Sequence, residues 1–370
     1  MSEHELHVDV TRSLLEDGTN GHNRLHPEIP AVLEVAPGDT VTLDLRDGFD
    51  CQIAPGSSCA DVLRLDPWRG HPMTGPIAVE GTEPGDVLDV RILAVEPAGF
   101  GFTAVIPSVG ALGDAFDRPF LVVWDLADGE ATSRDMPGVV IPGRPFVGVI
   151  AVAPSRALLE RATERESAIA GEGRFVLLPD ERSAVPPGGV PAREGLRTLP
   201  PRENGGNLDL RHARAGSTVS LPVHVPGALC SLGDPHFAQG DGESAGVAIE
   251  TSARVTVCFG VRKPSNGAPE MPLVHFVDEP VSGRREFVAT TGIPVDADGR
   301  NGYLDVRTAA QAALRGMLRY LTQERGLTDE QAYVLASVAC DLQISEIVNA
   351  PNALVSAVLP LDVFADQGRT

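Results

Sequence analysis

Residues 203–250 read ENGGNLDLRHARAGSTVSLPVHVPGALCSLGDPHFAQGDGESAGVAIE and bring carboxylates, imidazoles and amides together among glycines. Two apolar runs, Ser217–Val225 and Gly246–Val261, alternate and are rich in β-branched residues, so they predict strands. The polar segment Gly233–Glu243 between them is then a loop or strand end that projects its side chains from a sheet. Chemistry is often carried in this way, on loops that a rigid scaffold holds.

Outside this stretch, the first half of the chain contains two similar strand–turn–strand units. In residues 31–45 a Pro-Gly-Asp turn separates two β-branched runs, and residues 77–95 repeat this layout. Each unit predicts a hairpin, and hairpins of this kind build sandwiches or barrels. With 31 prolines and 39 glycines, few long helices fit into the chain. We therefore expect a mainly β, α+β protein with sandwich- or barrel-like sheets.

Three segments predict helices. Residues 156–171 follow a capping Ser155 and end at a glycine. Residues 305–325 place apolar side chains at helical spacing, and Thr328 with Gln331 forms a capping box for a second helix that reaches about Ala339. The sequence thus predicts a C-terminal helical pair near 305–340.

Six prolines between residues 179 and 202 suggest a connection between two parts of the chain. We expect a β-rich N-terminal subdomain at 1–180, a proline-rich connection at 181–202, and a C-terminal subdomain at 203–370 that carries the helical pair. The site is then shared between the two subdomains, with the segment from Asp66 to Glu80 as the opposite wall.

The overall charge of the protein disfavours some classes of binding partner. With 51 acidic and 30 basic residues the formal net charge is −21, which disfavours nucleic acid and anionic membrane surfaces. No apolar run approaches the roughly 20 residues that span a bilayer. The first residues, MSEHELHVDV, lack the features of a secretory signal, and the five scattered cysteines contain no CxxC pair. These features favour a cytoplasmic protein with reduced thiols.

The segment GDPHFAQGDGE at 233–243 carries the strongest chemical signal. Asp, His and Glu side chains at such short spacing suit a divalent cation, and mixed nitrogen and oxygen ligands are typical of catalytic zinc. The alternative is a glycine-rich turn with solvated carboxylates. For His71, in a polar loop, the alternative is a solvated imidazole, and Glu80, at the end of an apolar run, is either exposed or aimed into a cleft.

Several familiar signatures are absent from the sequence. It contains no Walker A motif and no dinucleotide-binding GxGxxG pattern. None of the cysteines lies in a nitrilase-like context. If the protein is a hydrolase, these absences favour metal-activated water as the nucleophile.

Taken together, these blocks resemble the acetamidase/formamidase family over about residues 20–363. The matching segments are GHNRLHPEIPAVLEVAPGDTV, HPMTGPIAVEGTEPGDVLDV, TSRDMPGVVIPG, LPPRENGGNLDLRHARAGSTVSLPVHVPGALCSLGDPHFAQGDGE and AYVLASVACDLQISEIVNAPNALVSAVLP. The resemblance implies a β-rich, metal-dependent, cytoplasmic and homo-oligomeric amidohydrolase that releases ammonia from short amides such as formamide or acetamide. A ring amide (lactam) is the related alternative.

We assign candidate roles on this basis, most of them to residues within the matching blocks. The expected metal ligands are Asp209, His236 and Asp241; the expected catalytic residues are Glu80, Glu243 and Asp234; and the expected substrate-binding residues are Asn207, His71 and Gln239. Zinc is the expected ion, with calcium as the candidate for a second site.

Two other classes of function also fit a β-rich chain with these ligands. One is a cupin-like metal-dependent oxygenase or isomerase. The other is a non-catalytic ligand-binding module whose metal is structural. Ammonia release from amides without oxygen separates the hydrolase from both.

Overall fold

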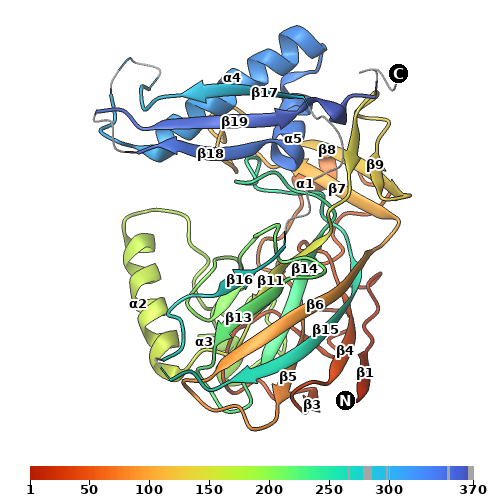
Figure 1. The fold of residues 1–370 in the computed structure, drawn as a ribbon, viewed down its shortest axis with the longest axis vertical. Helices are drawn as coiled ribbons and strands as arrows, with labels where there is room; N and C mark the ends of the chain where they lie inside the picture. Colours follow the sequence, from red (N-terminus) through yellow and green to blue (C-terminus); the bar gives the residue numbers. More distant parts are fainter. Residues whose placement is uncertain (266, 278–285, 297–298, 300, 348–350, 366–370) are drawn as a thin grey trace.

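The structure, a computed structural model, describes residues 1–265, 267–277, 286–296, 299, 301–347 and 351–365. Two six-stranded sheets face each other as a sandwich in the lower part of Figure 1. The first contains, in order, β1 (Glu3–Leu6), β4 (Thr40–Leu45), β15 (Ala253–Arg262), β6 (Val87–Pro97), β13 (Thr218–Pro222) and β16 (Leu273–His275). The second contains β12 (Gly205–Asn207), β11 (Phe146–Ala151), β14 (Cys230–His236), β5 (Met73–Val79) and β2 (Gly21–His22), with β3 (Leu33–Val35) also paired to β5.

Two smaller sheets and the C-terminal helices form the upper part of Figure 1. The four-stranded sheet contains β10 (Val140–Pro142), β9 (Glu130–Thr132), β8 (Phe120–Ala127) and β7 (Phe100–Val105). The three-stranded sheet contains β17 (Phe287–Gly292), β19 (Leu354–Pro360) and β18 (Asp341–Glu346). The helices are α1 (Cys59–Val62), α2 (Arg156–Gly171), α3 (Gly189–Glu194), α4 (Val306–Arg325) and α5 (Asp329–Ala339), with a 3₁₀ turn at Leu361–Val363.

The protein is mainly β with a few helices, as the sequence predicts, and no closed barrel is present in the described part of the chain. None of the described helices is long and apolar enough to cross a bilayer. Two of the three longer helices begin at the predicted caps Ser155 and Thr328, and the third begins after Asp305; each of these side chains accepts backbone N–H groups of the first turn. Gly326, in the left-handed conformation, ends α4.

The two Pro-Gly-Asp turns do not close hairpins, contrary to the sequence-based prediction. β3 pairs with β5 in one sheet, whereas β4 pairs with β1 and β15 in the other. The second turn in the same way separates β5 from β6, which pairs with β13 and β15. Each turn therefore carries the chain from one sheet of the sandwich to the other. True hairpins occur instead between β7 and β8 and between β8 and β9.

Two large apolar cores fill the molecule. One lies between the sandwich sheets and contains residues such as Leu43, Val90, Ile150 and Leu232. The other joins the smaller sheets to α4 and α5. Both draw residues from either side of the 181–202 connection, so the two sequence halves are interleaved in each core.

Candidate functional site

Strand β14 carries the two most buried groups of the site, Asp234 and His236. It lies between β11 and β5 in the sandwich, where His236 is opposite Phe146 and Gly233 is opposite Met73. All seven residues of β14 are buried, so these side chains project from a central strand rather than from a flexible loop. Asp234 has a φ of 55°, a left-handed conformation that is uncommon within a strand, and backbone outliers of this kind cluster at functional sites.

Two glycines allow the acids to approach this strand. The backbone N–H of Asp209 donates to the carbonyl of Gly148 on β11, and a Cβ on Gly148 would lie 2.7 Å from Asp209 Oδ1 and 2.9 Å from Asp234 Oδ2. A Cβ on Gly48 would overlap Asp234 Oδ1. Only glycine leaves room for the carboxylates at both positions.

Glu243 and Glu250 come from the segment that follows β14, which α5 holds in place. Ser337 on α5 accepts the N–H of Ala245 through its hydroxyl and the N–H of Gly240 through its carbonyl. Glu250 exchanges two backbone hydrogen bonds with Phe102 at the start of β7. The site thus lies where the sandwich meets the apolar core that joins the smaller sheets to α4 and α5.

The side chains converge around the His236 ring. Its Nε2 lies 3.3 Å from Asp234 Oδ1 and 3.3 Å from Glu250 Oε2, and its Nδ1 lies 4.0 Å from Asp209 Oδ1. His71 Nε2 lies 4.0 Å from Asp234 Oδ2. An edge-on contact with Phe146, with ring centroids 5.0 Å apart, supports the imidazole. Three carboxylates and two imidazoles therefore share one small volume.

Gln239 fixes a proton on the Nδ1 nitrogen of His236. The Gln239 amide N–H donates to the carbonyl oxygen of Asp209 over 2.9 Å. Its Oε1, which can only accept, then lies 2.9 Å from His236 Nδ1. His236 Nδ1 therefore donates to Gln239, and Nε2 is the ring nitrogen that faces Asp234 and Glu250. A partner of this kind commonly orients a histidine that binds a metal.

The charges of the cluster shift the pKa values of its members. Burial raises the pKa of Glu250 to about 8 and that of Asp209 to about 6, and burial together with the charge of Asp209 raises the pKa of Glu243. Burial opposes ionisation of Asp234, but attraction to His236 outweighs it and lowers the pKa. Burial also opposes charge on His236, yet Glu250 and Asp234 raise its pKa well above the usual value. The acids thus concentrate negative charge that a proton or a cation has to balance.

The donor set fits a divalent cation. Asp209, Asp234 and His236 offer ligand atoms within 4.8 Å of one another, and so do His236, Glu243 and Glu250. Asp209 Oδ1, Asp234 Oδ1, His236 Nε2 and Glu250 Oε2 are all buried without a hydrogen-bond partner. Buried polar atoms are normally paired, so this convergence is typical of a site for an ion.

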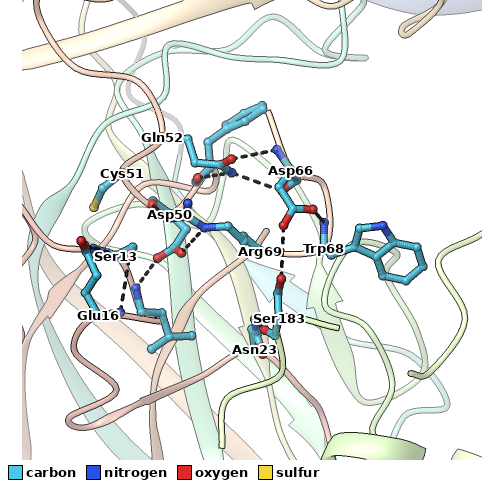
Figure 2. A network of polar contacts seen from close by, with 12 residues as sticks. Ser13, Glu16, Asn23, Asp50, Cys51, Gln52, Asp66, Trp68, Arg69 and Ser183 are labelled. Carbon is cyan, nitrogen blue, oxygen red and sulfur yellow. Dashed lines mark hydrogen bonds and ion pairs between the residues drawn. The ribbon is translucent and has the colours of Figure 1, made fainter. Parts of the chain in front are cut away.

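A cavity of about 470 Å³ opens onto the cluster and is lined by Asn207, Asp209, Asp234, His236, Glu243 and Glu250. The loop from Gly48 to His71 forms one wall, and Figure 2 shows the polar network that holds it. There Arg69 donates to Asp50, and Gln52 and Asp66 exchange hydrogen bonds over 2.8 and 3.2 Å.

Two of the residues proposed from the sequence lie away from the cavity. Glu80 is exposed just past β5, roughly 20 Å along the strand from Met73, because β5 runs away from the site. Asp241 forms an ion pair with Arg211 over 3.0 Å, and its N–H donates to Asp341. Gln239 contacts the Nδ1 side of the His236 ring and does not line the cavity.

Sequence reasoning missed Glu250, Gly48 and Gly148. Glu250 is the last residue of the opening stretch, where it looks like the polar end of an apolar run. Neither glycine lies in a block with an obvious ligand pattern. The only local signal at these two positions is a glycine next to a strand, and such glycines occur many times in this chain.

Both the sequence and the fold resemble those of known proteins. A profile of the Acetamidase/Formamidase family matches residues 7–366. An acetamidase of Mycolicibacterium smegmatis is 34% identical, covering 90% of this chain and 89% of its own, and a formamidase of Methylophilus methylotrophus is 32% identical, covering 96% and 92%. The structure of a gamma lactamase from Delftia acidovorans superimposes with a TM-score of 0.92 at 32% identity, over 98% of this chain and 93% of that one. The chain therefore belongs to the acetamidase/formamidase family of amide hydrolases.

Proposed function

We propose that this protein is a metal-dependent amidohydrolase that converts a small carboxamide and water into a carboxylate and ammonia, as for formamide or acetamide. The observation that carries the proposal is the set of buried oxygen and nitrogen atoms without hydrogen-bond partners around His236, at the inner end of a cavity. Relatives named acetamidase and formamidase support the choice of a linear amide.

Asp209, Asp234 and His236 are the proposed ligands of the ion. They form one of the two compact donor groups, and Gln239 leaves His236 Nε2 free to bind. A mixed nitrogen and oxygen set of three residues suits zinc with a position left for water. Such an ion, when bound, polarises a carbonyl group and makes a water molecule more acidic.

One of the remaining acids moves the protons of the reaction. Glu243, which lines the cavity, takes a proton from the attacking water and transfers it to the leaving nitrogen, since an amide anion is too basic to depart unprotonated. Asn207 and His71 also line the cavity and hydrogen bond the amide group of the substrate. Glu250, buried on the other side of His236 Nε2, holds the imidazole in place.

Replacement of the central histidine tests the proposal. His236→Ala is expected to lose bound metal and ammonia release from formamide together. His26→Ala is the matched control, because His26 is equally buried but does not line the cavity. Normal formamide turnover by His236→Ala would overturn the assignment, whereas equal loss in both variants would point to folding.

A ring amide is the second candidate, supported by the likeness to the gamma lactamase structure. Opening of a lactam yields an amino acid and no ammonia. Its detection therefore requires an assay for new primary amine. Turnover of a five-membered lactam with no ammonia from linear amides would favour this candidate.

A further inference from the structure

The cavity is lined mainly by apolar side chains beyond the acids. We infer that the site takes uncharged carboxamides whose acyl group is apolar and larger than acetyl. This inference rests on the proposed amide hydrolysis and adds the class of acyl group. It follows from the rigidity of the apolar wall, the exposure of its rim, the volume of the cavity and the charge of its lining.

The inner apolar wall is part of the folded core. Phe49, Val62, Leu65 and Ile106 line the cavity and belong to, or pack against, the same small core cluster. The ring of Phe49 also packs edge-on against Phe102 at a centroid distance of 5.5 Å. This wall is therefore preformed and presents a fixed apolar surface next to the acids.

The outer rim consists of apolar residues that water reaches. Leu63, Val109, Phe175 and Leu199 line the cavity and are 65%, 40%, 75% and 38% exposed. Single exposed apolar residues are common, but four around one mouth form a patch of the kind that marks a binding groove. An acyl chain that extends outward from the acids would cover this patch.

The volume exceeds what the smallest amides need. Acetamide has four non-hydrogen atoms, so it occupies on the order of 100 Å³ if each takes roughly the space of a water molecule. The cavity holds about 470 Å³. A formyl or acetyl group would leave most of the apolar wall in contact with water, whereas a longer acyl group would bury it.

The charge of the lining excludes anionic acyl groups. The charged side chains that line the cavity in the described part of the chain are the acids Asp66, Asp209, Asp234, Glu243 and Glu250 together with two histidines, with no lysine or arginine among them. Nothing there pairs with a second carboxylate, which the acids would repel. The acyl group is therefore not anionic, and the apolar wall favours an uncharged one.

A matched series of amides tests the inference on the metal-loaded protein. Acetamide, hexanamide and adipamate, a six-carbon amide that carries a carboxylate, are compared by ammonia release. Each methylene that becomes buried contributes roughly fourfold, so four of them raise kcat/KM on the order of 100-fold. We expect hexanamide to exceed acetamide by this factor, mainly through KM, and adipamate to fall below hexanamide.

Two leucine variants separate the rim from the rest of the surface. Leu63→Ser is expected to lower kcat/KM several-fold more for hexanamide than for acetamide. Leu15→Ser is the control, because Leu15 is 49% exposed but does not line the cavity. A change of oligomeric state in Leu63→Ser without any change for hexanamide would show that the rim is an interface and would overturn its proposed role.

The outcomes distinguish this inference from the proposed function. Ammonia from acetamide with no preference for hexanamide, or equal rates for hexanamide and adipamate, overturns the inference and leaves amide hydrolysis standing. No ammonia from any amide overturns the proposed function itself.

Discussion

Replacement of Gly48 by alanine tests how closely the acids are packed. An added Cβ would overlap Asp234 Oδ1 and lie 2.9 Å from Asp234 Cγ and 2.8 Å from His71 Cδ2. Because Cβ atoms essentially never approach a heavy atom within 3.0 Å, the carboxylate or the loop has to shift. A displacement of about 1 Å at a reacting centre can cost on the order of 100-fold in rate.

The stability of the fold should fall less than the activity. Overpacking at a tight position costs roughly 1–3 kcal/mol, and Gly48 lies on a loop that can adjust in part. We therefore expect Gly48→Ala to fold, with a lower unfolding temperature, and to lose on the order of 100-fold in kcat/KM. Ammonia release and thermal unfolding measured on the same sample separate the two effects.

Gly56→Ala is the matched control on the same loop. No heavy atom lies within 4 Å of a Cβ built on Gly56, so the same substitution should leave both activity and unfolding temperature unchanged. Wild-type activity in Gly48→Ala would refute the reasoning, because it would mean that the position of Asp234 does not matter to the reaction.

Three further variants have distinct expected results. Gln239→Leu removes the acceptor of His236 Nδ1–H and should weaken zinc binding 10- to 100-fold, measured by competition with a chelating dye. Arg165→Met removes the two 2.7 Å hydrogen bonds that hold the pKa of the Glu203 carboxyl at about 2. The stability that this ionised pair adds to the fold is fully present above the ordinary glutamate pKa of 4.5 and is lost as the pH falls toward 2. Wild type should therefore lose more stability than the variant between pH 5 and 3, by about 1 kcal/mol or less because the pair is partly exposed, in urea titrations. Glu80→Gln should change ammonia release less than about twofold, because surface substitutions away from special features have small effects.

Local patterns in the sequence predict the three longer helices and several of the strands. Ser155, Thr328 and Gly326 act through hydrogen bonds and backbone conformation within a few residues, so their roles can be read from neighbouring positions. Local patterns do not show which sheet a strand joins. The same Pro-Gly-Asp turn can close a hairpin or cross between sheets, and only the packing of the whole sandwich decides which.

Local patterns likewise predict one part of the candidate site and miss another. Asp209, Asp234, His236 and Glu243 share one stretch of sequence, and the structure brings them together. Gly48 contributes only the absence of a side chain, and its meaning depends on Asp234, which is 186 positions away in sequence. No local pattern can reveal such a contact, nor can it show that Glu80 lies just past the end of β5 that is far from the site.

The most direct test of the central claim is ammonia release from formamide by chelator-treated protein as zinc is titrated back. The account predicts no activity without the ion, with a rise that levels off near about one zinc per chain, as expected for a single three-ligand site. Full activity in protein from which all divalent metal has been removed would contradict it.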